Sequence, residues 1–118
     1  MPTYSHKLLS GSTQGKPIKV TSTTTGAANT VHTAVAGTTN FDLIDIYATN
    51  NSASAVDINL GWGGVTVDET LGPISIAADA GPVKIADKFP LQNGLVVAAW
   101  ASIADDILLT GVVSAYVA

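Results

Sequence analysis

The side chains in this sequence best suited to chemistry are two histidines and a few carboxylates that lie close together along the chain. The histidines are His6 and His32, and the chain has no cysteine. A zinc site needs three or four nitrogen, sulfur or oxygen ligands. Nothing in the spacing of the two histidines points to such a set. We therefore expect no metal and no cofactor, with His32 hydrogen-bonded within a strand and His6 solvated.

Six of the nine carboxylates fall into three pairs along the chain, and none of the pairs resembles a catalytic or calcium-binding arrangement. In an extended strand Asp42 and Asp45 project to opposite faces, which argues against their acting together. The other two pairs lie in expected loops, where carboxylates are normally solvated, and the spaced oxygens of a calcium loop are absent. These pairs are Asp68 with Glu69, and Asp105 with Asp106.

No arrangement typical of a nucleophile or of a phosphate loop is present. The chain lacks the Gly-x-Ser-x-Gly turn of many hydrolases. Its glycine-rich stretch, Gly61–Gly64, is followed neither by Gly-Lys-Ser/Thr nor by a helical pattern. We predict no catalytic residue and no enzyme activity. Trp62 is expected to pack inward at this bend, although an exposed Trp62 or Trp100 would be able to stack on a sugar ring.

The segments that must position these residues have the period of β-strands. Residues 55–62 alternate most clearly, with Val56, Ile58 and Leu60 on one face. About eight such segments are separated by turns at the spacing typical of sandwiches and barrels. The sequence predicts an all-β fold, an antiparallel β-sandwich of jelly-roll type, over residues 16–118. Residues 1–15 are expected to form a flexible N-terminal arm.

The apolar stretch from Gly94 to Ala118 is predicted to be a hairpin rather than a membrane span. Asp105 and Asp106 interrupt it, and neither half reaches the ~20 residues needed to cross a bilayer. The two carboxylates are expected at the turn between two antiparallel strands. In the second strand Leu108, Val112 and Tyr116 share the less apolar face, where they are expected to contact a neighbouring subunit.

Charge is scarce in this chain. Only 12% of the residues are charged, against ~25% in typical soluble domains. There is no arginine and the net charge is −4, so nucleic-acid binding is not expected. A weakly charged β-rich surface suits a subunit held against others, and we expect a homotrimer. In the arm, Tyr4, Leu8 and Leu9 complete the expected interface. The start of the chain lacks a signal-peptide pattern, which leads us to expect an intracellular product with no export sequence.

Several motifs, taken in order, resemble a family of small virion proteins of tailed bacteriophages. The resemblance spans nearly the whole chain, and each motif alone has little specificity. The motifs are Lys7–Ser12, Lys16–Val20, Val31–Ala34, Asp42–Asn50, Trp62–Gly64, Leu91–Leu95 and Leu109–Val113. The family is similar to capsid decoration, or cement, proteins, which are β-sandwich subunits bound to the outside of the head, often as trimers. It has no catalytic residues to carry over, and its capsid contacts do not map onto individual residues here.

The resemblance implies a structural protein on the capsid surface, with the major capsid protein as its partner. It would stabilise the head by bridging neighbouring capsid subunits, without a cofactor and without contact to nucleic acid or membrane. Two alternatives remain open. One is another part of the virion, such as a tail or head–tail joining protein. The other is a carbohydrate-binding or host-attachment module.

Overall fold

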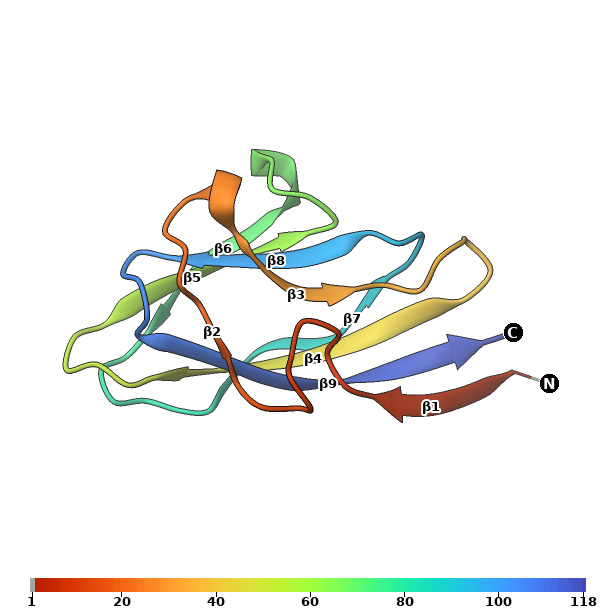
Figure 1. Cartoon of the computed structure of the whole chain (residues 1–118), viewed down its shortest axis with the longest axis horizontal. Helices are drawn as coiled ribbons and strands as arrows, with labels where there is room; N and C mark the ends of the chain where they lie inside the picture. Colours follow the sequence, from red (N-terminus) through yellow and green to blue (C-terminus); the bar gives the residue numbers. More distant parts are fainter. Residues whose placement is uncertain (1) are drawn as a thin grey trace.

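The computed structural model describes residues 2–118, which form two antiparallel sheets packed face to face (Figure 1). Sheet A contains β1, β2, β9, β4 and β7, and sheet B contains β3, β8, β5 and β6. The strands are β1 (Thr3–Lys7), β2 (Ile18–Lys19), β3 (Asn29–Thr33), β4 (Phe41–Asn50), β5 (Val56–Trp62), β6 (Thr70–Ile76), β7 (Val83–Leu91), β8 (Val96–Ala101) and β9 (Ile107–Val117). Two 3₁₀ turns, η1 (Thr25–Ala27) and η2 (Val67–Glu69), project from the sheet B side.

The order of the strands is that of a jelly roll. Sheet A runs β2–β9–β4–β7 and sheet B runs β3–β8–β5–β6, with every pair antiparallel. From β2 onward, every connection except that between β5 and β6 passes from one sheet to the other. This nesting of strands in two layers defines the jelly roll. The all-β antiparallel sandwich predicted from the sequence is confirmed. No helix within residues 2–118 is long and apolar enough to cross a membrane.

Alternation along each strand places one row of side chains in the space between the sheets. The predicted inward face of β5 is confirmed, because Val56, Ile58 and Leu60 are fully buried. Burying one such side chain contributes about 1.5–3 kcal/mol to folding. The other large core side chains are Leu9, Val20, Val31, Ile44, Ile46, Ile76, Leu91, Val97, Ile107, Leu109 and Val113.

The predicted hairpin between residues 94 and 118 is wrong. Strand β8 pairs with β3 and β5 in sheet B, whereas β9 pairs with β1, β2 and β4 in sheet A. The turn at Asp105 and Asp106 therefore joins the two sheets instead of two neighbouring strands. Both strands bury an apolar row, so they face each other across the core. Alternation identifies the buried face of a strand but not its hydrogen-bonding partner.

The expected flexible arm over residues 1–15 is also corrected, although Met1 lies outside the described residues. Strand β1 pairs with the last residues of β9, from Thr3 opposite Val117 to Lys7 opposite Val113. Leu9 is 2% exposed and belongs to the core. The Gly11 N–H donates to the Val31 carbonyl at 2.9 Å. The segment escaped prediction because an edge strand held by backbone bonds leaves no apolar pattern.

The connection between β5 and β6 contains the 3₁₀ turn η2. The Thr66 N–H donates to Glu69 Oε1 at 3.3 Å, and the Glu69 N–H donates to the Thr66 carbonyl at 3.0 Å. This reciprocal capping satisfies backbone groups that a strand would have bonded to a neighbour.

Two adjacent leucines test whether the N-terminal segment is part of the folded core. Replacing Leu9 with alanine should lower the free energy of unfolding by about 2–4 kcal/mol, because it opens a cavity in the core. The matched control is Leu8→Ala, since Leu8 is 57% exposed, and it should change stability by less than about 0.5 kcal/mol. Urea unfolding of both variants measures the difference. Equal, small effects would mean that this segment contributes nothing to the core.

Candidate interaction surface

The most concentrated polar cluster in the interior joins His32 of β3 to Asp42 of β4. Asp42 is 0% exposed and His32 is 1% exposed. His32 Nε2 lies 2.8 Å from Asp42 Oδ2, and the Val35 N–H donates to the same oxygen at 3.2 Å. The backbone N–H of Ser10 donates to His32 Nδ1 at 3.0 Å. Because Nδ1 accepts a hydrogen bond, Nε2 carries the ring hydrogen and donates it to Asp42.

This cluster contains a serine, a histidine and an aspartate, but they are not arranged as a catalytic triad. In a triad the histidine accepts a proton from the serine hydroxyl. Here the ring faces the amide of Ser10, while Ser10 Oγ accepts a hydrogen bond from the Thr33 N–H at 2.7 Å. Neither ring nitrogen is left to act as a base. The expectation that His32 is hydrogen-bonded within a strand is confirmed.

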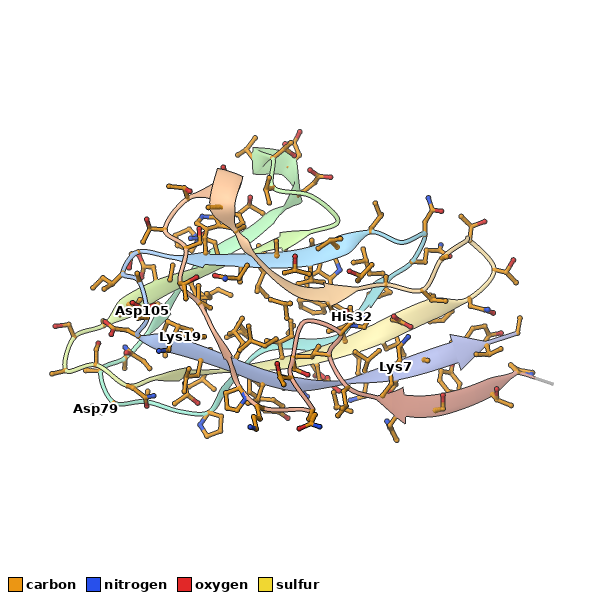
Figure 2. The ribbon with its side chains drawn as sticks, in the orientation of Figure 1. Lys7, Lys19, His32, Asp79 and Asp105 are labelled. Carbon is orange, nitrogen blue, oxygen red and sulfur yellow. The ribbon has the colours of Figure 1, made fainter. Side chains whose placement is uncertain are left out.

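Lys7 completes the cluster from the N-terminal strand. Its Nζ lies 3.2 Å from Asp42 Oδ1, although the angles fall outside those of a hydrogen bond. Figure 2 shows Lys7 of β1 and His32 of β3, which come from strands of different sheets. The cluster therefore ties β1, β3 and β4 together. Within residues 2–118, no group of three or more histidine and acidic side chains is arranged to hold a metal ion.

The outward-facing side of sheet A carries the exposed side chains of Tyr4 and Val112 among half-buried apolar and aromatic side chains. We call it the outer face of sheet A. It is built from β1, β9 and β4. The even-numbered residues of β1 and β9 and the odd-numbered residues of β4 point away from the core, as the burial pattern and register show. Its residues are Tyr4 and His6 of β1; Leu108, Thr110, Val112, Ser114 and Tyr116 of β9; and Phe41, Leu43, Asp45, Tyr47 and Thr49 of β4.

A row of three aromatic rings crosses the outer face of sheet A near the chain termini. Tyr4 lies opposite Tyr116, and Tyr116 lies opposite Phe41. The Tyr4 and Tyr116 ring centroids are 5.3 Å apart in an edge-on contact, and those of Phe41 and Tyr116 are 4.6 Å apart and stacked. Such cross-strand aromatic pairs hold neighbouring strands in register. They also leave a large apolar surface at this end of the sheet.

Four of the six interface residues that were predicted from the sequence lie on this face. Tyr4 is 62% exposed and Val112 is 37% exposed, while Leu108 and Tyr116 are half-buried. Leu8 is exposed but follows the end of β1. Leu9 is a correction, because it is buried in the core and unavailable to a partner. Sequence reasoning missed Phe41, Leu43 and Tyr47, because apolar residues occupy both faces of residues 41–50.

The same face holds a network of charges around Asp45. Lys84 Nζ lies 3.4 Å from Asp45 Oδ1 and 2.9 Å from Asp87 Oδ1. The backbone N–H of Lys88 donates to Asp45 at 2.9 Å. The hydrogen bond to Asp87, together with the charge of Asp45, raises the pKa of Lys84 above its usual range. Hydrogen bonds from Lys84 and Lys88 lower the pKa of Asp87. Asp42 and Asp45 do point to opposite faces, as predicted.

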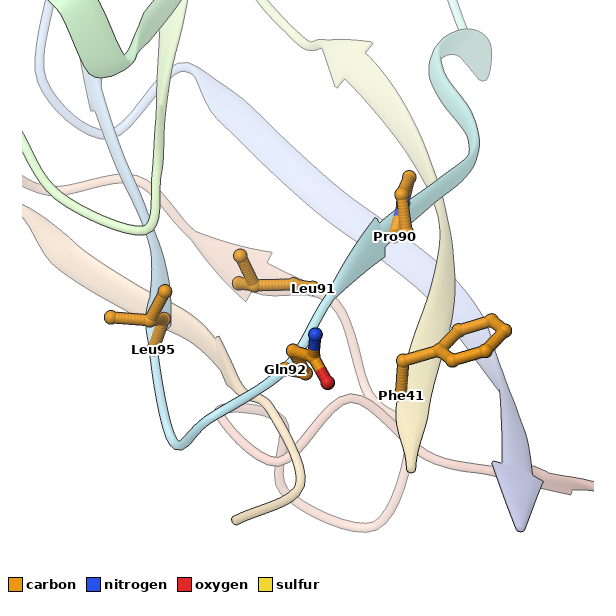
Figure 3. Close-up of a pocket in the computed structure, with 5 residues that line it drawn as sticks. All are labelled: Phe41, Pro90, Leu91, Gln92 and Leu95. Atoms are coloured by element: carbon orange, nitrogen blue, oxygen red, sulfur yellow. The ribbon is translucent and has the colours of Figure 1, made fainter. Parts of the chain in front are cut away.

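A pocket of about 370 Å³ opens beside the aromatic row. Figure 3 shows its lining, contributed by the first residue of β4, the end of β7 and the turn into β8. The lining residues are Phe41, Pro90, Leu91, Gln92 and Leu95. Four of these five side chains are apolar, so the pocket extends the apolar surface of the aromatic row around the end of the sandwich.

The two tryptophans occupy different environments. Trp62 packs partly against the core, its Nε1–H donates to the Pro90 carbonyl at 2.9 Å, and its ring meets Phe89 edge-on at 5.5 Å. This agrees with the predicted inward packing. Trp100 lies half-buried beside Asn59 in sheet B. Neither ring is fully presented as a platform for stacking a sugar.

Comparisons with protein-family models, with curated proteins and with solved structures find no match to this chain. The surface itself offers apolar and aromatic contacts over a pleated sheet face, with lysines at its margins.

Removing the carboxyl group of Asp42 tests whether the buried cluster is structural. Asp42→Ala should lower the free energy of unfolding by about 3–5 kcal/mol, because His32, Val35 and Lys7 lose their shared partner. The matched control is Asp57→Ala on sheet B, which should change stability by less than about 0.5 kcal/mol. Urea unfolding measures both. Similar losses in the two variants would contradict a special role for Asp42.

Proposed function

We propose that this protein is a structural virion protein, a capsid decoration protein that binds the outside of a tailed-phage head and bridges neighbouring capsid subunits. The observation that carries the proposal is the uncovered outer face of sheet A, with its row of three aromatic rings. Exposed apolar patches bounded by polar groups commonly mark surfaces that contact other proteins.

Three further features support this role. Charged residues make up only 12% of the chain, which suits a subunit that remains bound to other subunits. The polar cluster in the core uses its hydrogen bonds to join strands, and it presents no nucleophile or base. The order of the sequence motifs resembles small phage virion proteins. Jelly rolls occur in viral coat proteins and also in lectins, so the fold by itself does not select among functions.

A face that contacts two adjacent capsid subunits would stabilise a head by linking them. Once one subunit is bound, the second contact is made at high effective concentration, and modest contacts then add up to strong attachment. The rigid pleated face suits this task, because little conformational entropy is lost when it docks.

A pair of equally exposed apolar residues on opposite sheets tests the proposed face. Val112 of sheet A and Leu71 of sheet B are both 37% exposed. Val112→Ser should weaken binding to shells assembled from the phage's major capsid protein by about tenfold, or ~1.4 kcal/mol. Leu71→Ser should leave binding unchanged. Cosedimentation of protein with shells measures both, and equal losses would exclude the outer face of sheet A as the contact.

The remaining candidate roles predict different results. A tail or joining protein would be found away from the head when the protein is located on intact particles by antibody labelling. A carbohydrate-binding module would bind members of a glycan array. Binding to isolated shells together with a silent glycan array is the result that the decoration role requires.

We further propose that the free protein is a homotrimer. Cyclic symmetry allows part of the apolar surface of each copy to be covered by the next. Analytical sedimentation at tens of micromolar, the range of weak association, should give about three times the 12.0 kDa mass of one chain. A single-chain mass at that concentration would contradict the trimer.

A further inference from the structure

The charges of this protein are divided between its two sheets. Every lysine lies on sheet A or on the connection between β1 and β2, whereas sheet B contains no lysine or arginine among residues 2–118. Sheet A itself has four lysines and three aspartates, which leaves it one positive charge, and Lys16 on the connection between β1 and β2 adds a second. The six other carboxylates lie on β5 or in connections, and with them the total is the net charge of −4. They are Asp57, Asp68, Glu69, Asp79, Asp105 and Asp106.

The three aspartates of sheet A are all within ion-pair distance of lysines. Asp42 is paired with Lys7, Asp45 with Lys84, and Asp87 with both Lys84 and Lys88. Lys16 and Lys19 have no carboxylate within 4.0 Å among residues 2–118. The acidic groups of this sheet are therefore neutralised, and the excess on its surface is positive.

Two of these lysines flank the outer face of sheet A at opposite edges. Lys19 of β2 lies opposite Leu108, and Lys84 of β7 lies opposite Tyr47 with its Nζ 5.6 Å from the ring centroid. Strands β9 and β4 lie between β2 and β7. Three strand spacings, about 14 Å, therefore separate the two strands that carry these lysines. Figure 2 shows Lys19 along β2, with Asp79 and Asp105 in the connections at that end of the sandwich.

We propose that the partner of the outer face of sheet A is an acidic protein surface, with carboxylates opposite Lys19 and Lys84 and an apolar area between them, and that sheet B faces away from it. This inference rests on the proposed function and defines its partner further. A positive face seated on a negative one steers association and fixes orientation. The acidic groups of sheet B and the connections would be repelled by the same surface.

The composition of the face favours a protein over a polyanion or a membrane. The chain has no arginine, the residue that binds phosphate groups in a bidentate way. The face holds Val112 and Leu43 in its middle and the aromatic row at the end near the chain termini, and these side chains match apolar protein surface and not the phosphate backbone of DNA. Two flanking lysines are also fewer than the clusters of four to eight that bind anionic lipid headgroups.

The test compares two double variants that carry the same net charge. Lys19→Gln with Lys84→Gln removes two positive charges from sheet A, and Thr30→Glu with Thr33→Glu adds two negative charges to exposed positions of sheet B. Both changes take the net charge from −4 to −6. Binding of the full-length protein to shells of the phage's major capsid protein is measured at low and at high salt. Urea unfolding checks that each variant is folded.

At low salt the lysine variant should bind about fivefold more weakly than the unaltered protein, which corresponds to two exposed ion pairs. The threonine variant should bind within twofold of it. The loss in the lysine variant should shrink in about 1 M salt, where charges are screened within ~3 Å. If Lys84→Gln destabilises the network around Asp45, Lys19→Gln alone should still weaken binding about twofold.

The outcomes separate this inference from the proposed function. If the unaltered protein does not bind shells, the decoration role is wrong and the inference fails with it. If it binds but the two double variants bind equally well, the acidic partner is wrong and the decoration role stands. Tighter binding to double-stranded DNA or to phosphatidylglycerol vesicles than to shells would also overturn the acidic protein partner.

Discussion

The buried carboxyl group of Asp42 is the constraint on which the arrangement of this protein depends. A charged or polar group taken fully out of water costs several kcal/mol unless it is paired and hydrogen-bonded. Asp42 meets this requirement only when His32, Val35 and Lys7, which come from two other segments of the chain, pack against it. The lysine among them belongs to β1. Satisfying one carboxyl group thus helps to hold the N-terminal strand beside β9.

That placement of β1 creates the surface on the other side of the sheet. Successive residues of a strand point to opposite faces, so turning Lys7 inward sends His6 and Tyr4 outward. Tyr4 then meets Tyr116, and the register of β4 with β9 brings Phe41 into the same row. The core cluster and the aromatic row are therefore linked by the geometry of a single strand. A change in the register of β1 would disturb both at once.

The sequence revealed which side of a strand is buried more readily than which strands are neighbours. Alternation was enough to place Val56, Ile58 and Leu60 inside and to group Leu108, Val112 and Tyr116 on one outward face. It failed for the last two strands, because two apolar strands joined by a short turn resemble a hairpin whether they pair or face each other. In a jelly roll the chain passes to the opposite sheet at nearly every connection. This connectivity depends on all the strands together and not on any two neighbouring ones.

The N-terminal segment escaped prediction for a different reason. Its contribution consists of backbone hydrogen bonds, one ion pair and a single buried leucine, Leu9. None of these produces a periodic signal. The candidate surface was found only in part for the same kind of reason. Residues 41–50 have both faces largely covered, and Asp45 lies on the outer one beneath Lys84, so their outward row of Phe41, Leu43 and Tyr47 looked like core.

A preformed sheet face and a flexible arm bind their partners with different energetics. An arm that becomes ordered on contact loses conformational entropy at that moment, and part of its interaction energy is spent on ordering. Because β1 is already paired with β9 and anchored through Lys7 and Leu9, this segment does not lose conformational entropy by becoming ordered when a partner binds. Contact through the outer face of sheet A then requires little backbone change. In the proposed decoration role, attachment strength depends on how closely the partner's surface fits the aromatic row and the two flanking lysines.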